Sequence, residues 1–228
     1  MAETLSVRAV LDAVRNSFVF VGPGFMRHGE GFVYNGVRPD GGWQGHGYFA
    51  RKLRVLQSGR WVEVELRKRR WKRAGSNETC HSRPPDEVGG RSVCLTLLVL
   101  LLWWWLDRGV GLHDRDEQDP GFLDAVSKRT VQRYLRSMQV HALRFHQVCR
   151  EVVVARCEPR PIELLFPRGL SPPERLRRHR WPNFPGINQL WTAIAFILRT
   201  AIELQIPTAV LLAEARGREA QHKHGPWP

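Results

Sequence analysis

Alternating apolar and polar residues predict a β-hairpin in the first third of the chain. The alternation covers residues 50–57 and 60–71, and Ser58–Gly59 separates the two runs. Glycine accepts the positive φ that a two-residue hairpin turn requires. The apolar positions that share one face are Leu53, Val55, Val62, Val64 and Leu66. We therefore expect a hairpin with one apolar face and one basic face.

The chain before this hairpin gives weaker signals. Phe18–Val21 is a short apolar run that ends at glycine and proline, and residues 22–47 are rich in glycine without a sustained period. We expect loop here, with a single strand at Phe32–Tyr34.

From residue 91 the hydrophobic pattern becomes helical. Val93–Leu106 is uncharged and strongly apolar. As a helix it spans roughly 21 Å, whereas the hydrocarbon core of a bilayer is about 30 Å thick. The stretch therefore predicts a buried core helix and no transmembrane span.

Apolar residues spaced alternately four and three apart predict an amphipathic helix after Ser127. They are Val131, Leu135, Met138, Ala142, Phe145 and Cys149. Ser127 is a suitable N-cap, because its hydroxyl accepts a hydrogen bond from a free amide of the first turn. We expect this helix to continue to Arg156.

The C-terminal part contains a further apolar stripe at residues 190–202, which predicts a helix that is broken near Pro207. A last short helix is expected at Thr208–Arg216, followed by a polar tail at residues 217–228. Six prolines between residues 157 and 184 exclude one continuous helix in that stretch.

These patterns divide the chain into four parts. We expect a β-rich, ribbon-like region at 1–90, a helical region at 91–156, a proline-rich linker at 157–186, and a helical segment with a tail at 187–228. The expected fold class is mainly α with a small β-rich N-terminal part, an α+β protein that contains a helix-turn-helix-like segment.

Charge is the compositional feature that bears most on function. The 228 residues include 35 lysines and arginines against 22 acidic residues, a formal net charge of +13. This excess favours a polyanionic partner, nucleic acid first and an anionic membrane surface second. Four cysteines are too few for a disulfide scaffold, and the first fifteen residues lack the pattern of a signal peptide. We expect a cytoplasmic protein, associated with the nucleoid if it binds DNA.

The helix opened by Ser127 is the first candidate DNA-binding element. With a short helix at Phe122–Val126 before it, the layout is that of a helix-turn-helix, whose second helix lies in the major groove. Between Ser127 and Arg156 there are seven basic residues and one acidic residue, Glu151. The residues expected to contact DNA are Lys128, Arg129, Gln132, Arg133 and Arg136.

The basic run at the end of the hairpin is the second candidate. Ten lysines and arginines lie between Arg51 and Arg73 against two glutamates, and Trp61 and Trp71 are interleaved among them. Cations can hold phosphates while the indole rings stack or pack. The residues assigned to DNA binding here are Arg67, Lys68, Arg69, Arg70, Lys72 and Arg73.

The sequence offers no convincing metal or catalytic site. Cys80 and His81 are adjacent, but the other cysteines are scattered and no Cys-x-x-Cys pair occurs. Acidic residues gather in the loop at 107–119, whereas a two-metal nuclease collects its carboxylates from separate elements. No nucleophile elbow, P-loop or zincin motif is present. We expect no metal, no cofactor and no catalytic residue.

Residues 46–85 contain His46-Gly47-Tyr48, a basic strand that ends at Trp71, then Thr79 and Pro84-Pro85. In this order they resemble the N-terminal zinc-ribbon module of bacterial insertion-sequence transposases. The segment from Ser127 to Leu135 resembles the helix-turn-helix that follows such ribbons. The ribbon cysteines are missing, at residues 71–76 and at 21–25. The resemblance therefore implies a DNA-binding front end that has lost its metal and lacks the family's nuclease domain.

The combined hypothesis is a non-catalytic, transposase-derived protein that binds double-stranded DNA, either at a specific site or with tolerance of sequence. Association with further copies of the same chain is left open as a second kind of interaction.

Two alternatives belong to other classes. One is a membrane-surface protein that uses the tryptophan-rich helix and basic patches. The other is a helical interaction module that buries the stripes at 93–106 and 190–202 against a partner.

The absence of paired cysteines predicts a protein without stoichiometric structural zinc. Elemental analysis of protein purified without chelator should find far less than one zinc per chain. A value near one would contradict the prediction and would direct attention to Cys80, His81 and an upstream histidine as ligands.

Overall fold

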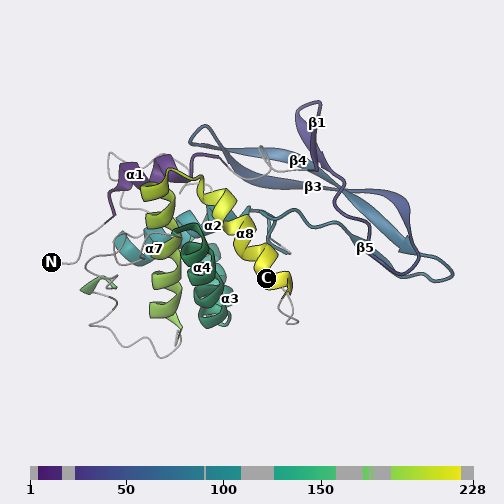
Figure 1. Ribbon diagram of the computed structural model, residues 1–228. Coiled ribbons are helices and arrows are strands. Elements are labelled where there is room, and N and C mark those ends of the chain that lie inside the picture. Colours follow the sequence, from purple (N-terminus) through teal and green to yellow (C-terminus); the bar gives the residue numbers. More distant parts are fainter. Residues whose placement is uncertain are drawn as a thin grey trace.

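The computed structural model describes residues 5–16, 24–89, 91–108, 126–157, 172–174, 176 and 186–221. They form a body of packed helices and a β-sheet whose long hairpin projects from that body (Figure 1). A mixed α+β fold, expected from the sequence, is confirmed.

The sheet has five strands in the order β1-β2-β4-β3, with β5 also paired to β4. The strands are β1 (Phe25–His28), β2 (Gly31–Tyr34), β3 (Trp43–Gln57), β4 (Arg60–Arg73) and β5 (Thr79–His81). β2 runs parallel to β4, whereas the other pairs are antiparallel. β4 is therefore the strand that holds the sheet together.

The predicted hairpin is confirmed in its register and its turn. Leu53 pairs with Val64 and Val55 with Val62, so the apolar positions do share one face. Ser58 and Gly59 both have positive φ, 50° and 78°, as the primed two-residue turn demands. The strands are longer than the alternation indicated, because pairing continues outward to Trp43 and Arg73.

The predicted strand at residues 32–34 is confirmed as β2, but β1 and β5 are not expected from the pattern. Both strands are short and mostly exposed, so neither carries the alternation by which a half-buried strand is recognised. The apolar run Phe18–Val21 lies outside the described residues.

The helices of the body come from both ends of the chain. They are α1 (Val7–Ala13), α2 (Leu95–Trp103), the π-helical turn η2 (Trp104–Arg108), α3 (Lys128–Gln139), α4 (Ala142–Cys157), α7 (Ile187–Leu204) and α8 (Thr208–Gln221). One hydrophobic core joins them to the inner part of the hairpin, with Leu53, Val55 and Leu66 contributing from the strands.

The predicted buried helix is confirmed as α2, all of whose residues are buried. Its first turn is capped from the preceding segment, since Asp86 Oδ1 accepts from the amide and the hydroxyl of Thr96 at 2.8 and 2.9 Å. Trp103 and Trp104 also lie inside the core. Within the described ranges, none of the helices is both long and apolar enough to cross a bilayer.

The expectation of one helix from Ser127 to Arg156 is wrong. The chain turns at Val140 and His141, which separate α3 from α4. The two helices contact different neighbours, because α3 packs against α2 whereas α4 lies along α7 and α8. The three-four spacing survives the turn, so the periodicity gave no sign of the break.

The expected boundary of the last helix is also wrong. α8 continues through Gly217 to Gln221. Leu211, Leu212 and Ala215 hold it on the core, and this packing offsets the weak helix propensity of a single glycine. The helix predicted at 190–202 is confirmed as α7.

Burial predicts a large difference in reactivity between two cysteines. Cys80 on β5 is partly exposed, whereas Cys149 on α4 is fully buried, and burial raises the pKa of its thiol well above the usual value. A thiol reagent should label Cys80 in the native protein and Cys149 only after unfolding, as peptide mapping can follow. Native labelling of Cys149 in a Cys80→Ser variant would contradict the fold.

Candidate nucleic-acid interface

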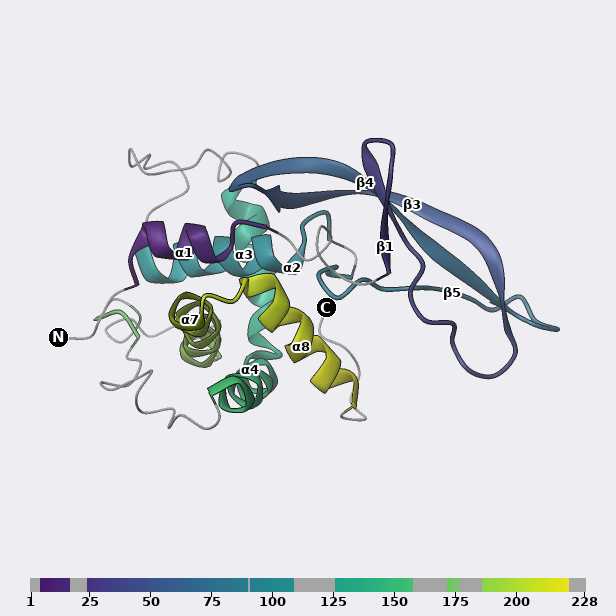
Figure 2. The ribbon, with the colours of Figure 1, turned by 45° about the horizontal axis from the view of Figure 1, so that its top comes forward.

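The outer part of the sheet forms an arm, which we define as residues 43–50 and 67–81. It projects beyond the helices in both views (Figures 1 and 2). Residues 44–50 of its outer strand are all exposed. At about 3.3 Å per residue, this half of β3 reaches roughly 25 Å from the body.

The inner end of the hairpin is fixed to the body by hydrogen bonds that its backbone amides donate. The amide of Ser58 donates to Asn16 Oδ1 and that of Gly59 to the carbonyl of Arg15, both at 2.9 Å. Further along β3, the amide of Arg54 donates to the carbonyl of Ser92 at 2.7 Å. These bonds hold the inner half of the hairpin, from which the arm extends, on the helical body.

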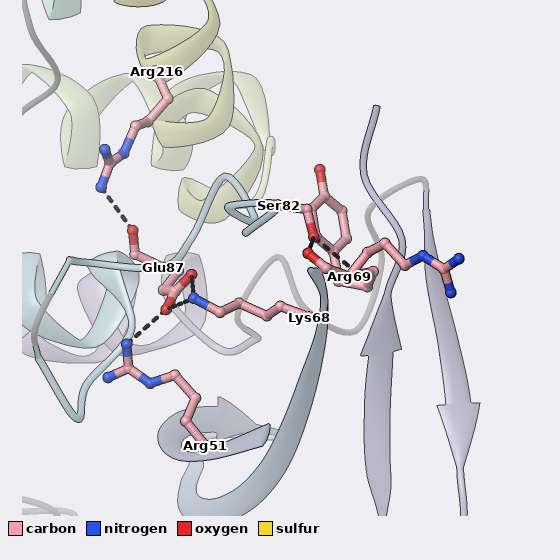
Figure 3. A network of polar contacts seen from close by, with 7 residues as sticks. Arg51, Lys68, Arg69, Ser82, Glu87 and Arg216 are labelled. Carbon is pink, nitrogen blue, oxygen red and sulfur yellow. Dashed lines mark hydrogen bonds and ion pairs between the residues drawn. The ribbon is translucent and has the colours of Figure 1, made fainter. Parts of the chain in front are cut away.

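A buried carboxylate ties the start of the arm to the helices (Figure 3). Glu87 accepts from Lys68 Nζ at 2.7 and 2.8 Å and from Arg51 Nη1 at 2.6 Å. The carbonyl of Glu87 accepts from Arg216 Nη2 of α8 at 2.7 Å. The side chain of Glu87 is only 2% exposed, so these contacts act with little screening by solvent.

Lys68 therefore differs from the other basic residues of its run. Its side chain is 7% exposed and is ion-paired to Glu87, which leaves the ammonium group unable to reach a phosphate. We remove Lys68 from the candidate interface. Its partner lies 19 residues away, and no local pattern in the sequence connects the two.

Side chains alternate between the two faces of β4, so the odd-numbered residues of the basic run at 67–73 lie on the face opposite to that of Lys68. Lys68 shares the core-side face with Val64 and Leu66, whereas Arg69 points away from the body (Figure 3). We define the outward face of the arm by Tyr48, Arg67, Arg69, Trp71 and Arg73.

Arg69 lies between two aromatic rings on this face. Its Cζ is 5.1 Å from the ring centre of Tyr48 and 5.6 Å from that of Trp71. Gly45 lies beneath the guanidinium, and a Cβ atom there would come within 2.9 Å of Arg69 Cζ. Neither Tyr48 nor Gly45 is recognisable as a binding residue from the sequence pattern, although glycine inside a strand often marks such a close approach.

The other two arginines of the outward face form exposed ion pairs. Arg67 Nε donates to Glu65 at 2.6 Å and Arg73 Nη1 to Glu78 at 3.1 Å, with all four side chains about half exposed. Pairs of this kind contribute little to stability, so a phosphate can displace the carboxylate at small cost.

Arg70 and Lys72 lie on the core-side face beyond Lys68, and β5 pairs alongside them. His81 of β5 stands edge-on to Phe49, with ring centres 4.8 Å apart. Burial, and then the positive charge of Lys68, lower the pKa of His81 below its usual value. This histidine adds no charge to the arm at neutral pH.

The second predicted set lies on α3. Ser127 caps the helix as expected, accepting from the Thr130 amide at 3.3 Å. Val131, Leu135 and Met138 are buried as expected. Arg129, Arg133 and Arg136 are exposed and Gln132 is half-buried, while the side chain of Lys128 lies outside the described part.

The structure places α3 and the arm in different parts of the molecule. α3 packs within the body against α2, α4 and α7, whereas the arm extends away from it (Figure 2). Most of the short helix expected at Phe122–Val126 lies outside the described residues. The described chain thus contains the second helix of the expected motif but not the first.

The described residues contain no cluster of three or more histidine, cysteine or acidic side chains that could hold a metal ion. The acidic loop at 109–119 lies outside the described ranges.

Comparisons with family models, curated proteins and solved structures found no significant match.

The Glu87 network predicts a strong dependence of stability on one carboxylate. Glu87→Gln leaves Lys68 and Arg51 without a buried counter-charge and should lower the free energy of unfolding by about 3–5 kcal/mol. The matched control is Glu63→Gln, whose exposed pair with Lys52 should cost about 1 kcal/mol or less. Denaturant unfolding measures both, and equal losses would contradict the assigned role of Glu87.

Proposed function

We propose that this protein binds double-stranded DNA without catalysing a reaction on it, and that the arm is the principal contact. The observation that carries the proposal is the projecting ribbon of β3 and β4, bordered along β4 by the short strand β5, with Arg67, Arg69 and Arg73 on its outward face. A chain of net charge +13 that displays cations on a protruding element favours a polyanion.

The shape of the arm supports a duplex as that polyanion. The major groove of B-DNA is about 12 Å wide and admits a two-stranded β-ribbon. Arg67 and Arg73 lie on the outward face on either side of Arg69 along β4, and their long, exposed side chains can reach phosphates at the edges of the groove. These contacts fix the position of the arm on the duplex and supply sequence-independent affinity.

Burial in the helical body weighs against the two alternatives. The membrane-surface hypothesis needs an exposed tryptophan-rich helix, but Trp103 and Trp104 are buried. The interaction-module hypothesis needs free apolar stripes, yet those of α2 and α7 pack into the protein's own core. The arm keeps its charged surface exposed, and this favours nucleic acid.

The helix α3 is proposed as a second contact, as the recognition helix of a helix-turn-helix. Its exposed arginines support this role. A transposase-like origin would suit a protein in which such a helix accompanies a basic ribbon, and we retain that origin as part of the proposal.

Removing two cations from the arm should weaken binding and its salt dependence. In Arg67→Ala/Arg73→Ala, the slope of log affinity against log salt should become shallower by roughly 0.9 for each lost phosphate contact. The control is Arg8→Ala/Arg60→Ala, which removes the same charge at exposed positions outside the arm, on α1 and at the start of β4. Gel-shift titrations over a range of salt measure both, and equal effects in the two variants would refute the arm as the contact.

The α3 contact is tested by Arg129→Ala/Arg133→Ala. These exposed residues contribute little to stability, about 0.5 kcal/mol each or less, so the variant should melt as the wild type does. Its affinity and salt slope for duplex DNA should fall. A folded variant with unchanged affinity and slope would show that α3 does not contact DNA and would leave the arm as the binding element.

A further inference from the structure

We infer that Arg69 is a base-reading residue of the arm and selects guanine in the major groove of the bound duplex. The inference rests on the proposed function and adds to it a residue that determines specificity. It follows from the way in which the protein holds this side chain, which differs from the way in which it holds Arg67, Lys68 and Arg73.

Both ends of Arg69 are held. Its backbone carbonyl accepts from the amide of Ser82 at 2.8 Å and from the hydroxyl of Ser82 at 3.2 Å. Its guanidinium lies between the rings of Tyr48 and Trp71 and above Gly45. An arginine placed in this way has already lost much of its rotamer freedom, so less entropy is lost on binding.

The guanidinium donors of Arg69 nevertheless have no hydrogen-bond acceptor in the part of the chain that the structure describes. Among the described residues, its guanidinium forms no ion pair, whereas Arg67 and Arg73 each bind a glutamate. The two rings lie at cation–π distance from the group and offer no lone-pair acceptor to its N–H donors. Arg69 is only partly buried, so these donors are open to solvent and to an acceptor on a bound partner.

Guanine has the acceptor geometry that such a group matches. Its O6 and N7 atoms lie side by side on the major-groove edge and accept two hydrogen bonds from the planar fork of an arginine. Arg69 is central on the outward face, between the arginines proposed to contact phosphates. A ribbon seated in the groove by those two residues presents Arg69 to the base edges.

The experiment begins with selection by the full-length protein from a pool of duplexes that carry a randomised core. The wild type should enrich guanine at one or more positions. Replacement of the enriched G·C pair by A·T in a single duplex should then weaken binding by roughly 5- to 150-fold.

Two variants separate the position of the guanidinium from its charge. Arg69→Gln should lose the preference for guanine and move it toward adenine, which glutamine recognises. Gly45→Ala keeps every charge, but its methyl group displaces the guanidinium, so the preference should disappear while the salt slope stays the same. Residue 45 is not among the positive-φ glycines, so alanine introduces no backbone strain.

Arg67→Gln is the matched control. It removes one charge from the same face and should weaken binding to all duplexes about equally while the guanine preference remains. Thermal melting of each variant confirms that it is folded.

The outcomes distinguish the inference from the function on which it rests. Loss of guanine preference in Arg69→Gln and Gly45→Ala, with retention in Arg67→Gln, supports it. Salt-sensitive binding without base preference, or an unchanged preference in both variants, overturns the role of Arg69 and leaves DNA binding intact. If the wild type binds no duplex at any salt concentration, the proposed function fails, and the inference fails with it.

Discussion

The ion pair between Glu87 and Lys68 is the contact on which the arrangement of this protein depends. It joins β4 to the segment that leads into α2, and Arg51 adds a second cation from β3. The neighbouring residue Asp86 caps α2, and Arg216 of α8 reaches the carbonyl of Glu87. Two consecutive acidic residues thus connect the sheet to two helices of the body. A buried carboxylate that lost these partners would be strongly unfavourable, so the arm and the helices are bound to fold together.

The basic run of β4 serves two purposes because its side chains alternate between faces. Lys68 faces the core, where the buried carboxylate of Glu87 neutralises its charge and ties β4 to the helical body. Arg67, Arg69 and Arg73 face outward, where their charges are available to a partner. One strand can therefore hold the arm in place and present cations to a polyanion, without a separate structural element for either task.

The outward face combines weakly held and firmly held cations. Arg67 and Arg73 form exposed pairs that a phosphate can replace, whereas Arg69 is fixed by two rings and a glycine. Positioning contacts to phosphate tolerate mobile side chains, but reading of a base edge requires a fixed one. This contrast is the physical basis for assigning the residues different roles on one duplex.

The sequence by itself determined the features that depend on neighbours along the chain. Alternation located the hairpin and its turn, the uncharged stretch located α2, and Ser127 marked the start of α3, because periodicity and capping are local properties. Only the tertiary structure decided which cations reach solvent. Lys68 and Arg69 are adjacent and both basic. Lys68 is paired with Glu87 in the core, whereas the guanidinium of Arg69 lies over Gly45 on the outward face, and both contacts join residues that are distant in sequence. The break between α3 and α4 has the same origin, since packing on α7 and α8 redirects a helix whose own pattern continues unchanged.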